Sequence, residues 1–473
     1  AAALHLIYVV LVLLTMDRLA EAIISFVRTE QHGSDFWCAP LVNHGSHSTV
    51  EVSVGTPPQK LDLVADTGSN DLLVSSCTCR ESGKCFRQSK CFTNTSSTFS
   101  FDDRGGQGPP KRVLNFGSGQ IFVECASDVA RVESVTAKMN DALMLILDHR
   151  LQFNRPFEGI LGLGLPRTEE NGRAVPGFLE KASIRRFSIC LTDRGSGVLR
   201  LNKTMDSNAL GSLGKHHWSV GFEGISVGDS KSPVLICSKE EGVGPEQKKP
   251  CGAIPDSGTT LMMGPSQHLF KLFQSICGAW PRCSSLAARQ QVDGSMAFQQ
   301  LLWRCKRWMS EGDGLDELPS LYFHVFGSGG EKQVLEIPGA LYVVQVDVEG
   351  AQSLAKQSPH TFGSAIHVDG LLPWGESDET GGLCFPAFSE LNAEIGENRS
   401  VWILGTPFFY QYQVNYDLDA KPPAIAFSKD PCGSCAANKE FFSKRAKRGA
   451  RRPMKLSGPP RLPSFSLSQS KVL

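Results

Sequence analysis

Apolar residues in this sequence gather in short runs separated by glycine, proline and polar positions, and long stretches with helical periodicity are rare. Runs such as Leu61–Ala65 and Val401–Leu404 have the length of a strand. The sequence contains 46 Gly and 27 Pro, which favour turns. The pattern therefore predicts a mainly β fold built from many short strands.

Both ends of the chain depart from this pattern. Leu4–Met16 is a run of 13 mostly apolar residues, shorter than the ~20 that a membrane span needs. Small residues follow at Ala20 and Ala22, so we expect residues 1–22 to be a signal peptide, with a signal anchor or a buried core segment as alternatives. Residues 436–473 lack apolar periodicity and hold four prolines, which predicts a disordered tail.

The charges also set the C-terminal segment apart from the rest of the chain. Of 473 residues, 41% are hydrophobic and 20% charged, which is typical of a globular protein with two or three domains or lobes. The 48 basic and 48 acidic residues cancel, yet residues 436–473 hold ten basic residues and one acid, leaving 38 basic and 47 acidic residues elsewhere. A body with a balance of −9 is a poor nucleic-acid binder, and we expect no such partner. For the basic tail, a solvated end is favoured over a processing site, a sorting signal or an anionic-surface contact.

Cysteines and glycosylation triplets indicate the compartment. Fifteen cysteines are many for a cytosolic enzyme and favour an oxidising environment. Asn94, Asn202 and Asn398 each begin an Asn-x-Ser/Thr triplet and are glycosylation candidates. We expect the protein to enter the secretory pathway, as a secreted protein or in an acidic endomembrane compartment, and to have no permanent membrane span.

One motif occurs twice. Asp66-Thr67-Gly68-Ser69 and Asp256-Ser257-Gly258-Thr259 each follow a short apolar strand, 190 residues apart. An apolar strand ending in glycine comes later in each half, at 157–162 and 401–405. A single Asp-Thr-Gly carries little information, whereas two, each followed by such a strand, form a specific signal.

The residue types of this repeat suit paired carboxylates. Gly68 and Gly258 allow tight turns that bring amides near each acid, and the hydroxyls of Thr67, Ser69, Ser257 and Thr259 can bond and orient it. If a pseudo-twofold axis brings Asp66 and Asp256 together, like charges ~3 Å apart cannot both ionise. One carboxylate would then activate a water molecule while the protonated one donates to a substrate carbonyl.

With these residues in place, the sequence resembles the pepsin family of aspartic endopeptidases from about residue 48 to 430. Besides the two repeated loops, the second within 253–265, the resemblance rests on four segments in the family's order, 54–59, 157–163, 187–191 and 402–409. It implies a mainly β, bilobal pepsin-like fold with a pseudo-twofold axis and a catalytic cleft between the lobes. It implies lobes at 48–204 and 205–435, after a short pro-like or N-terminal segment at 23–47.

The same resemblance implies the chemistry. Asp66 and Asp256 would be the catalytic pair, supported by the loop hydroxyls, in an enzyme that cleaves internal peptide bonds of extended polypeptides without a metal or other cofactor. We expect a monomer. A pepsin-like binding protein with weak or no catalysis is the alternative, although both loops keep their aspartate and glycine. An interaction protein driven by its tail is a third hypothesis.

The flap is where this chain departs from the family pattern. The stretch that aligns with the flap is 114–119, with Phe116, Gly117 and Ser118 as candidate substrate contacts. Phe116 stands where the family usually has Tyr, and Leu73 where it usually has Trp. These two replacements predict a more apolar flap with fewer hydrogen bonds. Asp71 adds a charge five residues after Asp66, where it would raise the pKa of Asp66 if it faced inward.

The cysteine assignments are less specific. Cys77, Cys79, Cys85 and Cys91 form either disulfides or a zinc site, and disulfides are favoured in a secreted chain. Cys237–Cys251 and Cys305–Cys384 resemble bridges of the family, Cys277–Cys283 would close a small loop, and Cys432 with Cys435 is interpreted as a structural bridge. Cys38, Cys125 and Cys190 remain unassigned, and the odd total leaves at least one thiol outside intramolecular pairs.

Three other patterns are given a structural interpretation. Gly224-Ile225-Ser226-Val227-Gly228 matches a nucleophile-elbow motif, but turn and strand residues follow it instead of a helix. His216-His217 has no third ligand at a fixed spacing. Residues 243–250 and 287–309 are expected to be inserted surface loops.

Overall fold

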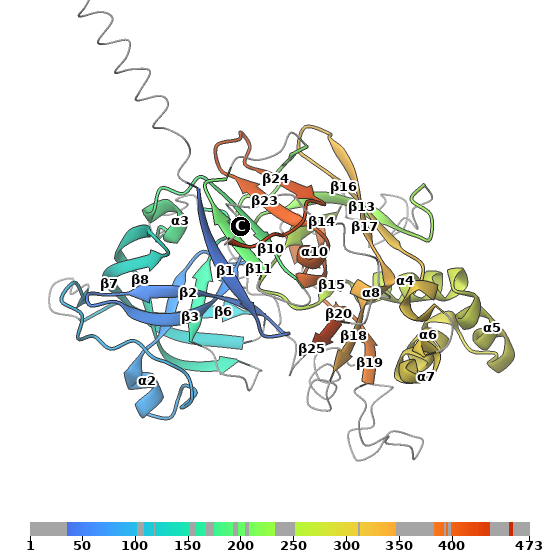
Figure 1. Cartoon of the computed structure of the whole chain (residues 1–473), viewed down its shortest axis with the longest axis horizontal. Coiled ribbons are helices and arrows are strands. Elements are labelled where there is room, and N and C mark those ends of the chain that lie inside the picture. Colours follow the sequence, from blue (N-terminus) through green and yellow to red (C-terminus); the bar gives the residue numbers. More distant parts are fainter. Residues whose placement is uncertain are drawn as a thin grey trace, which may run out of the picture.

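The computed structural model describes residues 36–101, 108–117, 119–151, 158–166, 175–192, 197–203, 208–231, 251–310, 313–346, 383–391, 394–395, 399–435 and 454–456. Within these residues the fold is mainly β, as the sequence pattern predicted. The early strands lie on one side of the molecule and the later sheet and helices on the other (Figure 1).

The first sheet has 14 strands and includes the central strands that join the two halves. Its order is β12-β24-β23-β10-β11-β1-β2-β3-β9-β4-β8-β7-β5, and β6 pairs with β7. In chain order the strands are β1 (Trp37–Asn43), β2 (Ser48–Val54), β3 (Gln59–Asp66), β4 (Leu72–Ser75), β5 (Ser100–Phe101), β6 (Lys111–Phe116), β7 (Gly119–Val132), β8 (Val135–Leu151), β9 (Gly159–Gly162), β10 (Arg186–Cys190), β11 (Gly197–Leu201), β12 (Leu210–Gly211), β23 (Gln413–Asp417) and β24 (Ala424–Ser428).

The second sheet has eight strands, ordered β17-β16-β13-β14-β22-β15-β20 with β21 paired to β22. These are β13 (Val220–Val227), β14 (Cys251–Pro255), β15 (Met262–Gly264), β16 (Leu321–Phe326), β17 (Lys332–Ile337), β20 (Phe388–Glu390), β21 (Glu394–Ile395) and β22 (Arg399–Leu404). A third, three-stranded sheet contains β18 (Val343–Val346), β19 (Leu383–Pro386) and β25 (Met454–Leu456).

The sequence repeat corresponds to a repeat of strand pairing. Strand β3 runs parallel to β9, with Asp66 opposite Gly162, and β14 runs parallel to β22, with Pro255 opposite Leu404. The next strand of each half, β4 or β15, pairs antiparallel with the same apolar partner, β9 or β22. Each aspartate strand therefore pairs with the apolar strand that follows it in its own half.

The helices lie mostly in the second half, at the edge of the molecule in Figure 1. They are α2 (Cys77–Glu81), α3 (Phe178–Lys181), α4 (Ser266–Ala279), α5 (Pro281–Gln290), α6 (Gly294–Trp303), α7 (Cys305–Met309), the 3-10 helix η1 (Gly314–Glu317), α8 (Gly339–Tyr342) and α10 (Thr406–Gln411).

The expectation that residues 287–309 form surface loops was wrong, because most of them lie in α5, α6 and α7. Asp293 caps α6 by accepting a hydrogen bond from the amide of Met296 at 3.1 Å. Phe298 and Leu302, four residues apart on α6, are both fully buried. Residues 243–250 lie outside the described part of the chain.

Two expected boundaries also change at the ends. Strand β1, which falls in the segment expected to precede the first lobe, pairs with β11 and β2 and belongs to the fold. Residues Met454–Leu456 of the predicted disordered tail form β25, which runs parallel to β18. The backbone hydrogen bonds of a sheet edge do not need apolar periodicity in the added strand. The predicted signal peptide lies outside the described residues, and no described helix is long and apolar enough to cross a membrane.

Six disulfides are present among the described residues. The four clustered cysteines form Cys77–Cys91 and Cys79–Cys85, which decides against a zinc site there. Cys277–Cys283 and Cys305–Cys384 pair as expected. Cys251 is disulfide-bonded, and Cys237 lies outside the described residues.

The interpretation of Cys432 and Cys435 as one local bridge was wrong. Cys432 is bonded to Cys190, and Cys435 to Cys38. Strand β1 carries Cys38 and strand β10 carries Cys190, and each of these cysteines bonds to one of the two cysteines near the end of the fold. Cys125 is a buried thiol that donates to Met144 Sδ at 3.6 Å.

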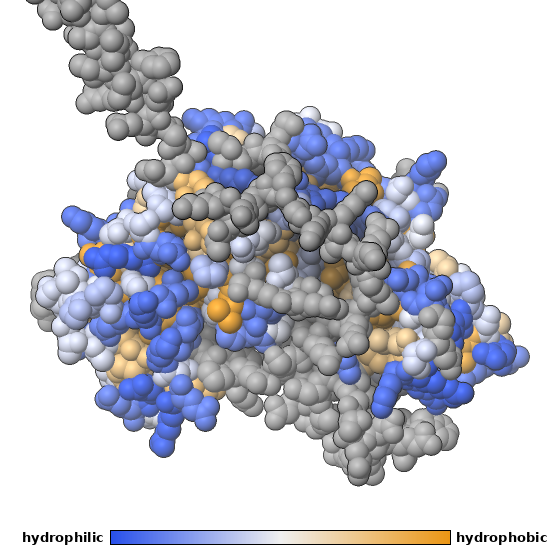
Figure 2. Space-filling model, in the orientation of Figure 1, coloured by the Kyte–Doolittle hydropathy of each residue, from blue (hydrophilic) through white to orange (hydrophobic). Residues whose placement is uncertain are grey.

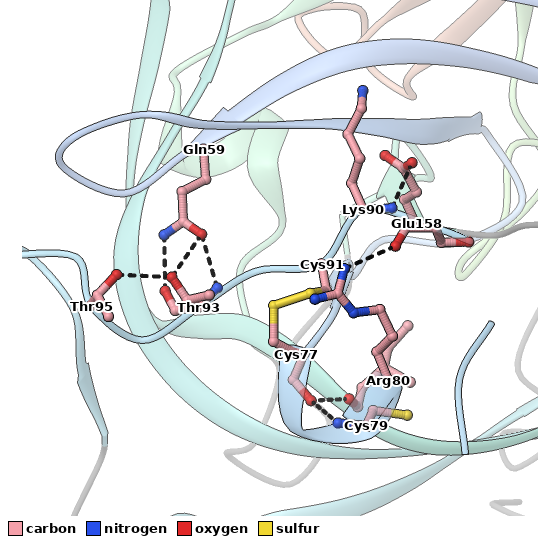
Figure 3. The surroundings of a disulfide bond; sticks show 12 residues. Gln59, Cys77, Cys79, Arg80, Lys90, Cys91, Thr93, Thr95 and Glu158 are labelled. Atoms are coloured by element: carbon pink, nitrogen blue, oxygen red, sulfur yellow. Dashed lines mark hydrogen bonds between the residues drawn. A yellow bond between two sulfur atoms is a disulfide. The ribbon is translucent and has the colours of Figure 1, made fainter. Parts of the chain in front are cut away.

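Figure 3 shows how the Cys77–Cys91 disulfide fixes the segment after β4. Beyond Cys91, Thr93 exchanges two hydrogen bonds with Gln59 at the start of β3, both 2.8 Å long. On the other side, Lys90 N donates to Glu158 Oε1 at 3.1 Å. The start of β3, the strand that leads to Asp66, is therefore tied to the segment that follows Cys91.

The visible surface is hydrophilic over the helices at its two sides. Figure 2 shows hydrophilic residues at both outer ends of the visible face, over α2 and over α5 and α7. The largest fully buried side chains include Trp218, Trp402 and Tyr416, which lie in the interior of the sheets and their connections.

Helix α4 packs on β22 through a buried histidine. Trp402 Nε1 donates to His268 Nδ1 at 3.3 Å, and the two rings are stacked. His268 Nε2 is buried and has no hydrogen-bond partner among the described residues. Burial, with a smaller effect of Lys271, lowers the pKa of His268 to about 4.

Removing the Cys190–Cys432 bridge, by replacing both cysteines with alanine, is expected to lower the free energy of unfolding by about 2–5 kcal/mol. Its cysteines lie 242 residues apart, whereas Cys79 and Cys85 are separated by 6. Since a longer closed loop restricts the unfolded chain more, removing Cys79–Cys85 should cost less. Urea unfolding of both variants tests this, and equal losses would contradict the loop-length argument.

The His268→Asn variant is expected to be less sensitive to acid than the wild type. The unfolded chain takes up this proton near pH 6.5 and the folded chain only near 4, so stability is lost as pH falls through that window. Between these pH values the wild type loses about 3 kcal/mol of its free energy of unfolding through His268. Asparagine does not titrate, and it keeps a hydrogen-bond acceptor for Trp402. Urea unfolding at several pH values between 7 and 4 measures it. His216→Asn, at a half-buried bend, is the control, and parallel profiles for H268N and wild type would refute the expectation.

Candidate active site

The two repeated loops meet at the junction of the two halves. Strand β3 ends at Asp66, and Asp256 directly follows β14. Both aspartates are fully buried. Leu163 N donates to Asp66 O at 2.7 Å, and Asp256 N donates to Leu404 O at 3.0 Å. The apolar strand paired with each aspartate strand therefore also fixes the aspartate backbone.

Each carboxylate is held by the same two donors of its own loop. Asp66 Oδ1 accepts from Gly68 N at 3.0 Å, and its Oδ2 accepts from Ser69 Oγ at 2.7 Å. The second loop repeats this, because Asp256 Oδ1 accepts from Gly258 N at 2.8 Å and Oδ2 from Thr259 Oγ1 at 2.6 Å. Such short hydrogen bonds to a carboxylate fix its plane.

The sequence predicted that the hydroxyls of Thr67 and Ser257 bond their own aspartates. In the structure each hydroxyl instead donates to the backbone of the opposite loop. Thr67 N donates to Ser257 Oγ at 3.1 Å, and Ser257 N donates to Thr67 Oγ1 at 3.0 Å. Thr67 Oγ1 donates to Pro255 O at 2.9 Å, and Ser257 Oγ to Ala65 O at 2.8 Å. We call these four bonds the interlock.

The loops approach too closely for a side chain at Gly68. A Cβ atom there would lie 2.7 Å from Asp256 Oδ2 and 2.8 Å from its Cγ. The opposite carboxylate therefore requires glycine at this position. This contact places the first loop directly against the acid of the second.

Further contacts around the second loop were not foreseen from the sequence. Thr260 Oγ1 donates to Ser46 O, which ties this loop to the connection between β1 and β2. Thr406 N donates to Thr259 O at 2.9 Å, and Thr406 Oγ1 donates to Thr260 O at 2.7 Å. The partners are up to 214 residues apart, so spacing within a motif gives no signal for them.

The flap residues lie on the hairpin of β6 and β7. Phe116 ends β6 and is buried, and Gly117 follows it, while Ser118 lies outside the described residues. Phe116 belongs to the same apolar cluster as Leu73, together with Val64 and Ile160. The two positions at which this chain departs from the family pattern thus share one apolar environment.

The remaining candidate residues lie outside the two motifs. Asp71 is 5% exposed, and its backbone oxygen accepts from Gly162 N at 3.1 Å. Asn94 is exposed, Asn202 is half-buried, and Asn398 lies outside the described residues. Ser226 is fully buried within β13, where it hydrogen bonds to His324 Nε2, so the structure gives this serine no strand-to-helix turn and no access to substrate.

Comparison with known proteins agrees with this geometry. A sequence model of the eukaryotic aspartyl protease family matches residues 48–428. Similar proteins include cathepsin E from Mus musculus, 30% identical over 265 residues, and phytepsin from Hordeum vulgare, 30% identical over 242 residues. Pregnancy-associated glycoprotein 1 from Ovis aries is 28% identical over 247 residues.

These pairwise matches cover only part of each protein. They span 51%, 48% and 49% of this chain and 60%, 44% and 59% of the respective relatives. The family match is longer, and it includes both loops of the interlock and both buried aspartates. The chain therefore belongs to the eukaryotic aspartyl protease family.

Proposed function

We propose that the chain is an aspartic endopeptidase that hydrolyses internal peptide bonds of proteins through a water molecule activated by Asp66 and Asp256. The observation that carries this proposal is the matched support of the two acids: each accepts one amide and one hydroxyl hydrogen bond from its own loop. The interlock holds the two loops against each other.

The chemistry follows from two carboxylates in one buried site. Two negative charges at one buried junction repel each other strongly, so we assign opposite roles to the two acids, one ionised and one protonated. The ionised member accepts a proton from water, which attacks the peptide carbonyl. The protonated member donates to the carbonyl oxygen as charge develops there. Ser69 and Thr259, as donors, orient the two acids for these roles.

The flap would close over an extended polypeptide through apolar contact. The burial of Phe116 together with Leu73 supports this, since neither side chain has a hydrogen-bonding group. A flap held in this way lacks the directional hydrogen bond of a phenol. Substrate selection would then depend on apolar side chains near the flap.

The disulfides support a site of action in the secretory pathway. Six bridges among the described residues, two of which join β1 and β10 to the end of the fold, require an oxidising compartment to form. A carboxylate pair that shares a proton favours activity at acidic pH. We therefore place activity in a secreted or acidic endomembrane setting.

Asp66→Asn and Asp256→Asn are each expected to lower kcat/KM for cleavage of an unfolded protein by about 10²–10⁴-fold or more, because each removes an essential proton donor or acceptor. Cleavage is measured between pH 3 and 7. Asp62→Asn is the matched control, since Asp62 lies on the same strand but pairs with Lys90 on the outside.

Full activity in either aspartate variant would refute the mechanism. If the wild type cleaves nothing, titration with a statine-type transition-state mimic separates the alternatives. Tight binding would indicate a competent site with an unmatched substrate. The absence of binding would favour the alternative of a pepsin-like binding protein.

Gly68→Ala is expected to lower kcat/KM by about 10²-fold. The added methyl would lie 2.7 Å from Asp256 Oδ2, so one loop must shift and the carboxylates must separate. A displacement of about 1 Å costs on the order of 10²-fold in rate. Gly278→Ala, in α4 with no atom within 4 Å of its Cβ position, is the control and should retain full activity. Activity of G68A within twofold of wild type would contradict the close approach.

A further inference from the structure

Tyr416 lies directly beneath the two catalytic loops. It belongs to β23 of the central sheet, and its side chain is fully buried. Its Oη donates to Pro255 O at 3.2 Å and lies 3.5 Å from Thr67 Oγ1. Pro255 O is also the acceptor for Thr67 Oγ1. The phenol thus joins the interlock at the peptide that precedes Asp256.

Two other aromatic side chains hold this phenol in place. Phe187, in β10, stacks on Tyr416 with ring centroids 4.6 Å apart and an angle of 13°. Trp218 lies 5.0 Å from the Tyr416 ring, and its Nε1 donates to Leu163 O at 3.1 Å. Leu163 N in turn donates to Asp66 O. This aromatic bracket, defined as Phe187, Trp218 and Tyr416, therefore reaches the backbone of both loops.

We propose that Tyr416 is a positioning residue for the carboxylate pair, which sets the orientation of the Asp256 loop against the Asp66 loop through Pro255 and Thr67. The proposal rests on the proposed endopeptidase function and adds to it a group outside both Asp-Thr/Ser-Gly motifs. A phenylalanine at this position would preserve the stack with Phe187 but lose the contact with the interlock.

The phenol is suited to a permanent donor role. Burial, together with the charge of Asp256, raises the pKa of Tyr416 far above its usual value. The hydroxyl therefore stays protonated at every pH at which an aspartic protease works. It can hold Pro255 O without exchanging protons with the carboxylates, which leaves the shared proton to Asp66 and Asp256.

The test compares Tyr416→Phe with Tyr412→Phe. Tyr412 directly precedes β23 and is also buried, but among the described residues its Oη bonds to Glu336, accepting from N at 2.7 Å and donating to O at 3.1 Å. Each variant removes one buried phenol oxygen and keeps the ring. Only Y416F alters a contact with the catalytic loops, so Y412F controls for a general loss of stability.

In Y416F, kcat is expected to fall about three- to tenfold with KM within about twofold, because the lost hydrogen bond orients the reacting groups and does not bind substrate. Affinity for a statine-type mimic should fall by a similar factor. Amide hydrogen exchange should accelerate in peptides that contain Thr67 and Ser257 and stay unchanged in β8. Y412F should match the wild type in all three measurements.

The outcomes separate this inference from the proposed function. If Y416F has the same kcat, statine affinity and amide exchange as the wild type, the positioning role is overturned. It is also overturned if Y416F and Y412F lose equal kcat and affinity while exchange rises throughout the chain. If the wild type neither cleaves protein nor binds the mimic, the endopeptidase proposal fails. The exchange of the two loops still decides whether Tyr416 holds them: local acceleration supports the inference, and unchanged exchange refutes it.

Discussion

The exchange of hydrogen bonds between Thr67 and Ser257 is the constraint on which the rest of the site depends. Each residue uses both its amide and its hydroxyl on the opposite loop, and all the atoms involved are buried. Leaving one such buried polar group unpaired costs about 1–3 kcal/mol, so the four bonds hold the loops at a single spacing. At this spacing the two carboxylates stay close, and each is oriented by an amide and a hydroxyl of its own loop.

The local half of this arrangement could be predicted from the sequence. Ser69 lies three residues after Asp66 and Thr259 three after Asp256, so a tight turn returns each hydroxyl to its own acid. The residue type shows that Thr67 and Ser257 are donors, but not the direction in which they donate. Their partners lie 190 residues away in the chain, in the other half of the fold, so spacing within either motif gives no signal for them.

The same distinction explains the other differences. A β fold with two related halves follows from short apolar runs and a duplicated motif, whereas Tyr416 lies in a strand whose five residues are all buried, so no alternation marks it. The helices α5–α7 were missed because they are short and Cys283 is the one buried residue of α5, so apolar periodicity is weak where the insert begins and it was interpreted as surface loops. The prediction of the disulfide partners was wrong for a related reason. Cys432 and Cys435 are close in sequence, but the fold brings Cys190 next to Cys432 and Cys38 next to Cys435.

These two long-range bridges set an order for the maturation of the chain. Cys38 and Cys190 leave the ribosome 397 and 242 residues before their partners, an interval on the order of 10–80 s at normal rates of synthesis. Cys77–Cys91 and Cys79–Cys85 span only 14 and 6 residues, so they can close first and withdraw four thiols from competition. The central sheet can then be completed only after translation has delivered β23 and β24, long after the two short disulfides can form.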